Sequence, residues 1–244
     1  MAMLEIRGLR KQFGGVLAVQ GLDFDLEEGE ILGLIGPNGA GKTTVFNLIS
    51  GFLRPSAGDI KFQNESLSGC EPHQVCFKGI TRTFQIVQPF RTLSVLENVM
   101  IGAFIQKNKY RLAREKALEV LHFSGLLEMR NQEAGSLPIA SQKRLELAKA
   151  LATEPKLLLL DEVMAGLTAT EIAEVLTMIR KIRDAGITLL LIEHVMHAVM
   201  SVSDRILVLH HGEKIAEGKP YDVSKDKKVL DAYLGEDFML DVQH

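Results

Sequence analysis

Hydrophobic and polar residues alternate along much of the first sixty positions of the chain. In 22–27, every apolar side chain is followed by an acidic one. A period of two puts successive side chains on opposite faces of a strand, so the pattern predicts antiparallel strands with one face in water. The apolar positions of this pattern are Leu4, Ile6, Leu22, Phe24, Leu26, Ile60 and Phe62. Turns are expected at Gly14-Gly15 and Glu28-Gly29.

Farther along the chain, apolar residues form continuous runs instead. These runs lie at 157–160, 187–192 and 206–209. They are typical of strands that are buried on both faces of a parallel sheet. Between the first two runs, Thr168 and Glu171 fit a capping box that starts a long helix, and Gly186 ends it. A hairpin over 213–217 is expected after the last run.

The middle of the chain, from 89 to 136, shows helical spacing and no strand pattern. Ser94 and Glu97 fit a capping box at a helix start, and Gly125 closes a second amphipathic helix. The expected apolar face of that second helix consists of Leu112, Ala117, Val120 and Leu121. A further helix is expected over 141–153.

Strands that alternate with helices predict an α/β fold with a mostly parallel sheet. The length of 244 residues fits one or two domains. We expect a single domain with a core of 1–88 and 141–244, which includes the antiparallel β subdomain. Residues 89–140 are expected to form an inserted α-helical subdomain.

The composition excludes several classes of partner. A net charge of −3 gives no general surface for polyanions, so no nucleic acid is expected. No apolar run approaches the ~18 residues that span a bilayer, and the first residues lack the basic and apolar stretches of a secretory signal. We therefore expect a cytoplasmic protein in which Cys70 and Cys76 are reduced thiols.

A glycine-rich segment follows the apolar run at 31–35 and opens a helical pattern. It consists of Gly36, Pro37, Asn38, Gly39, Ala40, Gly41, Lys42, Thr43 and Thr44. This is the spacing of a P-loop, in which backbone N–H groups and a helix start surround a phosphate. Lys42 can reach the terminal phosphates, and the Thr43 hydroxyl can ligate Mg²⁺. The segment predicts a nucleoside triphosphate site; the alternative is a turn that only caps a helix.

Three more polar groups stand where buried strands are expected to end, which is where open α/β sheets bind ligands. Asp161 is positioned to support Mg²⁺ through its water shell, and Glu162 to polarise an attacking water. His194 follows the next strand and could hydrogen-bond a γ-phosphate. The alternatives are a solvated strand end for the two acids and a structural role for the histidine.

Taken in order, these motifs resemble those of ABC transporter ATP-binding subunits over nearly the whole chain. The matching positions are Gly36 to Thr44, Gln85, Leu137 to Leu151, Leu160-Asp161-Glu162 and His194. The resemblance implies a P-loop NTPase (RecA-like) core that binds and hydrolyses ATP with Mg²⁺. It implies catalytic roles for Glu162, His194, Gln85 and Lys42.

The resemblance also suggests roles that the residues alone do not. Phe13 falls where the family stacks an aromatic ring on adenine; the alternative is a core phenylalanine. Gln85 falls in the loop that senses Mg²⁺ and links the core to the helical lobe. Residues 165–168 fall in the loop through which two ATPase subunits contact each other.

Within the family, the chain is most similar to the ATP-binding subunits of branched-chain amino-acid importers. The similar stretches are 81–85, 92–102, 144–148, 212–223 and 233–236. Members of that subfamily also handle amides, urea and aromatic acids. The resemblance implies a second ATP-binding subunit, a separate integral membrane permease and an extracytoplasmic substrate-binding protein. The chain would then lie peripherally on the cytoplasmic face of the inner membrane.

The sequence departs from the family where two subunits meet over ATP. The signature loop, commonly Leu-Ser-Gly-Gly-Gln, reads Leu-Pro-Ile-Ala-Ser over 137–141, Val163 replaces a proline, and Thr168 replaces an aspartate or asparagine. Three alternatives stay open: a lipopolysaccharide-export ATPase, a soluble scaffold or switch, and a nearly inactive subunit of a heterodimer.

Overall fold

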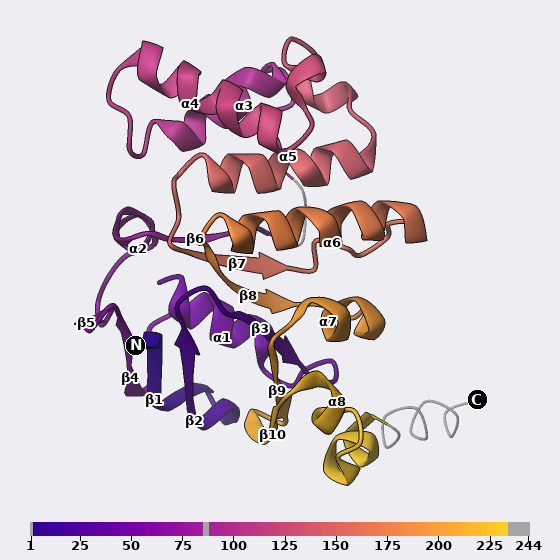
Figure 1. Cartoon of the computed structure of the whole chain (residues 1–244). Coiled ribbons are helices and arrows are strands. Elements are labelled where there is room, and N and C mark those ends of the chain that lie inside the picture. The colour runs from indigo at the N-terminus through magenta and orange to yellow at the C-terminus, as the bar shows by residue number, and fades with distance from the viewer. Residues whose placement is uncertain (1, 85–87, 234–244) are drawn as a thin grey trace. The chain divides into compact units, whose positions relative to one another are not determined.

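A computed structural model describes residues 2–84 and 88–233 of the chain (Figure 1). Contacts within the chain define two compact units, Met1–Pro72 with Thr188–His244, and His73–Ile187. The first unit therefore combines both ends of the chain, and the second is a continuous segment.

The first unit contains the antiparallel sheet that the alternating pattern predicts. Its strands are β1 (Ala2–Phe13), β2 (Val16–Glu27), β4 (Ala57–Phe62) and β5 (Glu65–Ser66), in the order β2-β1-β4-β5. The apolar positions of the pattern are buried. The prediction of antiparallel strands with one wet face is confirmed.

Buried parallel strands form the other sheet of the first unit. They are β3 (Ile31–Ile35), β8 (Thr188–Ile192) and β9 (Arg205–His210), and β3 pairs in parallel with both of the others. β10 (Glu213–Gly218) returns antiparallel to β9 and forms the expected hairpin. The helices of this unit are α1 (Lys42–Ile49), α7 (Met196–Val202) and α8 (Pro220–Val223).

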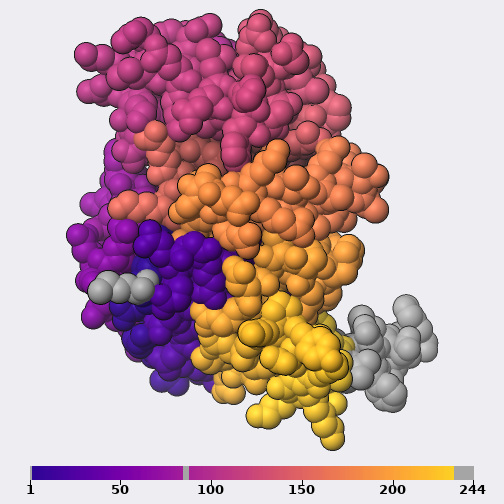
Figure 2. Space-filling view, in the orientation of Figure 1, coloured from indigo at the N-terminus to yellow at the C-terminus, as the bar shows by residue number. Residues whose placement is uncertain are grey.

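The second unit is mainly helical. Its helices are α2 (Pro72–Lys78), α3 (Val95–Ala103), α4 (Tyr110–Phe123), α5 (Ile139–Leu151) and α6 (Ala169–Asp184), with short 3₁₀ turns at Leu127–Met129 and Ala134–Ser136. Two parallel strands, β6 (Ile80–Arg82) and β7 (Leu157–Asp161), complete it. α3 packs against both α4 and α5, and their side chains form the magenta and pink surface in Figure 2.

Both capping boxes are confirmed. The Ser94 hydroxyl accepts a hydrogen bond from the Glu97 N–H, and Thr168 and Glu171 make the same exchange at the start of α6. Each box satisfies two N–H groups that a helix start otherwise leaves without an intrahelical partner. In the residues that the structure describes, no helix is long and apolar enough to cross a membrane.

Some sequence-based boundaries were wrong. α5 begins at Ile139, two residues earlier than expected, with Pro138 directly before it at φ −56° and ψ 153°. Leu112 is partly exposed and Ala113 is buried in its place, since 113, 117, 120 and 121 share one face at helical spacing. The sequence analysis missed α2, β6, α7 and α8, whose short lengths give weak periodic signals.

Candidate functional site

The P-loop segment joins β3 to α1 in the first unit, and two of its glycines lie against other backbone. A Cβ on Gly36, whose φ is +150°, would stand 2.1 Å from the Leu209 carbonyl oxygen. A Cβ on Gly41, whose φ is +104°, would stand 2.4 Å from the Ala18 carbonyl oxygen. Both distances are shorter than any real contact, so glycine is required at each position.

The β9–β10 turn holds the loop through a hydrogen bond, and β2 holds that turn. Gly212, in the β9–β10 turn, donates its N–H to the Ala40 carbonyl at 3.0 Å. Gln20 of β2 binds the same turn twice, through its backbone N–H to Gly212 at 2.9 Å and through its side-chain amide to the His211 carbonyl at 2.7 Å. Sequence reasoning missed these supports, because nothing in the local pattern links residues almost two hundred positions apart.

Lys42 lies inside the loop and its side chain is buried. Its ammonium donates to the carbonyls of Gly36 at 2.6 Å and Pro37 at 2.8 Å. The charge is thus held at the start of α1, where N–H groups and the helix dipole also favour an anion. Gly41 caps the helix without a side-chain hydrogen bond, and the neighbouring Thr43 is exposed.

Phe13 ends β1 and is 44% exposed, with the Lys11 ammonium 5.1 Å from its ring centroid. Its partner in register is Val16, two residues before the Ala18 that touches the P-loop. This exposure rules out the alternative of a core phenylalanine, and leaves the ring accessible for stacking.

His194 lies two residues beyond the end of β8 and is exposed, while the Glu193 before it is buried. β8 runs parallel to β3, with Ile192 opposite Leu34. His194 and the P-loop therefore follow the carboxyl ends of neighbouring strands, the edge at which ligands of such sheets bind.

Asp161 is the last residue of β7 in the second unit, and its carboxylate pairs with Arg82 of β6. The distance from Arg82 Nη2 to Asp161 Oδ2 is 2.6 Å, and the two side chains are 7% and 4% exposed. The Asp161 N–H also donates to the Thr83 hydroxyl at 3.2 Å. Arg82 thus fixes the orientation of the carboxylate. The local sequence gave no chemical signal for this role.

Glu162, the next residue, has a left-handed backbone with φ of +50°. Such a conformation costs a residue other than glycine about 1–3 kcal/mol, and residues that adopt it cluster at functional sites. Its carbonyl accepts hydrogen bonds from the Ala165 N–H at 3.3 Å and from the Lys143 ammonium at 3.4 Å. These contacts hold the turn while the side chain stays partly exposed.

The altered signature segment lies at the start of α5. Pro138 is the residue before the helix, and Ala140 and Ser141 are both 9% exposed within its first turn. The Gln142 side chain donates to the Leu137 carbonyl at 2.8 Å. Ser141, which ends the altered signature, is therefore largely covered. Gln85 lies outside the described residues.

The donors named for Mg²⁺ are oxygens, the chemistry that this ion prefers. Within the described ranges, no group of three or more histidine, cysteine or acidic side chains could hold a metal. Mg²⁺ is commonly bound by one or two protein oxygens together with substrate phosphates and water.

The comparisons with known proteins agree with this chemistry. Residues 19–165 match the ABC transporter family, and 213–239 match the branched-chain amino acid ATP-binding cassette transporter family. The chain is 39% identical to the high-affinity branched-chain amino acid transport ATP-binding protein BraF of Pseudomonas aeruginosa, over 96% of this chain and 98% of that protein. It is 40% identical to LivG of Escherichia coli strain K12, with the same coverage.

Solved structures show the same fold. The ADP conformation of MJ1267, an ATP-binding cassette of an ABC transporter, gives a TM-score of 0.88 at 32% identity, covering 96% of this chain and 99% of that one. The dimeric bacterial ABC transporter cassette MJ0796 gives 0.81 at 24% identity, covering 89% and 99%. At that identity, the second likeness shows the fold alone.

The buried Arg82–Asp161 pair generates a prediction about stability. Arg82→Met should lower the free energy of unfolding by about 3–5 kcal/mol, because it leaves an uncompensated buried carboxylate. Adding Asp161→Asn should recover much of that loss. Arg111→Met is the matched control, since Arg111 pairs with Glu115 on the surface of α4 and should cost less than about 1 kcal/mol. Urea unfolding measures all four proteins; equal losses for Arg82→Met and Arg111→Met would refute the argument.

Proposed function

The chain belongs to the ATP-binding cassette family of ABC transporters, and we propose that it powers the import of branched-chain amino acids. Members of this family that serve transporters bind and hydrolyse ATP. The observation that carries the proposal is the P-loop with the Lys42 ammonium already inside it. The cargo is inferred from the names of relatives such as BraF and LivG.

In the proposed reaction, the β- and γ-phosphates of ATP enter the P-loop and exchange with the carbonyls that hold Lys42. The Lys42 ammonium and the start of α1 then stabilise the negative charge, and Phe13 stacks on the adenine. Mg²⁺, held by the Thr43 hydroxyl, by Asp161 through water and by Gln85, would neutralise charge that develops on the phosphates.

Glu162 and His194 would act on the terminal phosphate. Glu162 polarises the attacking water, for which its partly exposed carboxylate beside Asp161 is suited. His194 donates a hydrogen bond to the γ-phosphate from the end of β8. Arg82 holds Asp161, so we assign it a positioning role rather than contact with substrate.

We expect the working form to contain a second ATP-binding subunit, identical or related. Each P-loop would face the partner's signature loop, and the loop at 165–168 would contact the partner. Closure on ATP and reopening after hydrolysis would supply the work.

A separate permease would receive this motion, and residues 89–140 are the segment that we propose to dock it. The proposal is supported by apolar side chains that this segment leaves exposed, among them Phe90, Ile101 and Phe104. The chain would then be peripheral on the cytoplasmic face of the membrane, and an extracytoplasmic protein would deliver the cargo.

Two alternatives to the proposal differ in weight. A lipopolysaccharide-export ATPase is not favoured, because relatives at 34–41% identity over nearly the whole chain are named for branched-chain amino acids. A soluble scaffold or switch would purify with soluble partners, whereas a transport subunit would purify with membrane proteins.

Changing Glu162 tests the hydrolytic step. Glu162→Gln should retain ATP affinity but lose hydrolysis by roughly 10²–10⁴-fold, the contribution of a general base. Glu174→Gln, on the surface of α6, serves as the control and should hydrolyse ATP normally. Phosphate release from the purified proteins is the measurement. A Glu162→Gln rate within a few-fold of the wild type would remove Glu162 from the mechanism.

The altered signature segment should make ATP-dependent dimerisation of this chain weaker than that of relatives with the common signature. Pro138 has neither a hydroxyl nor an N–H, and Ala140 carries a Cβ where glycine would let backbone approach a phosphate. Pro138→Ser with Ala140→Gly should therefore increase ATP-dependent dimerisation, most visibly in the Glu162→Gln background. One charge-assisted hydrogen bond regained per site is worth about 1.5–3 kcal/mol. Analytical ultracentrifugation measures the dimer fraction. An unchanged fraction would show that the departure from the family signature has no effect on dimerisation.

A further inference from the structure

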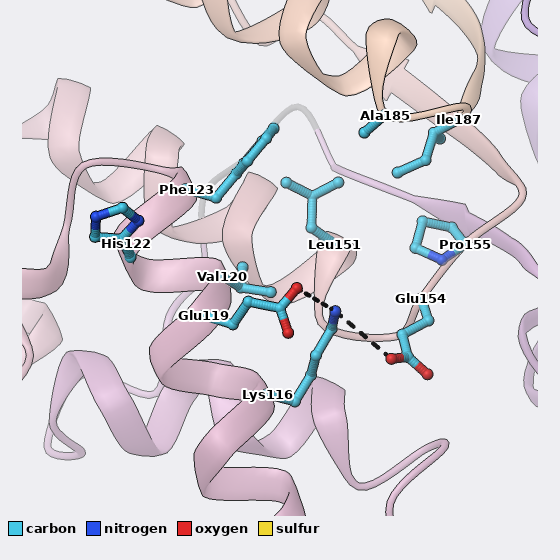
Figure 3. Close-up of a pocket in the computed structure, with 10 residues that line it drawn as sticks. All are labelled: Lys116, Glu119, Val120, His122, Phe123, Leu151, Glu154, Pro155, Ala185 and Ile187. Carbon is cyan, nitrogen blue, oxygen red and sulfur yellow. Dashed lines mark hydrogen bonds and ion pairs between the residues drawn. The ribbon is translucent and has the colours of Figure 1, made fainter.

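The second unit contains a cavity that has no part in the proposed reaction. Its volume is about 520 Å³, within the range of about 300–1,000 Å³ that is typical of small-molecule sites. Apolar side chains form one side of it (Figure 3); they are Val120, Phe123, Leu151, Pro155, Ala185 and Ile187. A ligand seated here would bury an aliphatic group against this wall.

An ionic row forms the other side of the cavity (Figure 3). The Lys116 ammonium lies 2.9 Å from Glu119 Oε1 and 3.5 Å from Glu154 Oε1, and Glu154 also accepts a hydrogen bond from Lys107 at 2.7 Å. Burial raises the pKa of Glu154, but the hydrogen bonds and charges of Lys107 and Lys116 outweigh it and lower the pKa below its ordinary value. The cavity therefore presents carboxylates and an ammonium side by side.

Three helices end at this cavity. Phe123 is the last residue of α4, Leu151 is the last residue of α5, and Ala185 caps α6. Each helix C-terminus carries a partial negative charge of about −0.5. Lys107 and Lys116 already balance the charges of Glu119 and Glu154. The helix ends therefore supply the unbalanced negative charge that favours a positively charged group within the cavity.

We propose that this cavity binds a free aliphatic α-amino acid. The ligand's ammonium would lie between the glutamates and the helix ends, and its carboxylate would accept from Lys116, because an ammonium has three donors and the two glutamates take two. Its side chain would pack on Phe123 and Leu151. The choice of amino acid class rests in part on the proposed function, since the cargo would be released on the side where this subunit lies.

Other ligand classes suit the cavity less well. A simple anion could accept from Lys116 but would bring no positive charge to the negative helix ends. An amine without a carboxylate would leave the third donor of Lys116 without a ligand partner. A ligand without an aliphatic part would leave the apolar wall exposed to water. It would then lose about 25 cal/mol of binding free energy for each Å² of apolar surface that stays exposed.

Calorimetric titration of the purified full chain with L-leucine tests the site. L-leucine should bind saturably. Three analogues should each bind at least about tenfold more weakly: 4-methylpentanoate lacks the ammonium, 3-methylbutylamine lacks the carboxylate, and glycine lacks the side chain. Saturation-transfer NMR should detect the leucine methyl groups near the protein.

Two variants attack the site from opposite sides. Lys116→Gln and Phe123→Ala should each weaken L-leucine by about tenfold or more. Arg111→Gln removes a positive charge from the same helix outside the cavity and should change nothing. Circular dichroism checks that the variants are folded. Unsaturable binding of L-leucine, or equal affinity in all three variants, would overturn the proposal.

Uptake of labelled leucine by vesicles that carry the whole transporter separates this site from the proposed function. Uptake of leucine with no binding to the isolated subunit would refute the cavity site and leave the cargo assignment standing. The opposite result is leucine binding that Lys116→Gln weakens, together with a transporter that does not take up leucine. That result would support the cavity site and refute the cargo assignment.

Discussion

The close approach of Gly36 to the Leu209 carbonyl is the constraint on which the nucleotide site depends. β3 and β9 pair in parallel, with Ile35 opposite Val208, so Gly36, the residue that leaves β3, comes beside Leu209 of β9. A side chain at position 36 would collide with that carbonyl. Only glycine lets the loop turn there and bring α1 to the edge of the sheet.

The β9–β10 turn also holds the P-loop, at Ala40. Gly212 donates to Ala40, and Gln20 of β2 bonds to the turn in two places. The turn and β2 together therefore fix the phosphate-binding backbone before any ligand arrives. Preorganised donors of this kind need no rearrangement at the moment of reaction, which is why they stabilise charge well. In the second unit, Arg82 does the same for the carboxylate of Asp161.

The sequence predicted most of the elements, because long apolar runs and capping boxes carry strong local signals. The strand at 157–160 and the helix that begins after Thr168 are examples. The short helix α7 and the three-residue β6 were missed, since few residues give little periodicity. Leu112 was misassigned by one position, because Ala113 completes the buried face of α4 and alanine is a weak hydrophobic signal.

The sequence motifs pointed to the candidate site, but the residues that hold those motifs in place could not be predicted. The P-loop glycines and the acids Asp161 and Glu162 at the end of β7 were proposed from the sequence. Arg82, Gln20 and Gly212 act through contacts between distant parts of the chain. Hydrogen bonds of that kind join residues far apart in the sequence, whose proximity no local pattern contains. The roles given to Glu162 and His194 stay predictions until activity is measured.

Calorimetric titration with Mg²⁺-ATP tests the central claim, that the preformed P-loop binds a nucleoside triphosphate through Lys42. The wild-type chain should bind ATP with one site per chain. Lys42→Ala should lose most of that affinity, because it removes the charge held beside Gly36 and Pro37. Lys181→Ala, on the exposed side of α6, should bind as the wild type does. Equal ATP affinity in Lys42→Ala and the wild type would contradict the account.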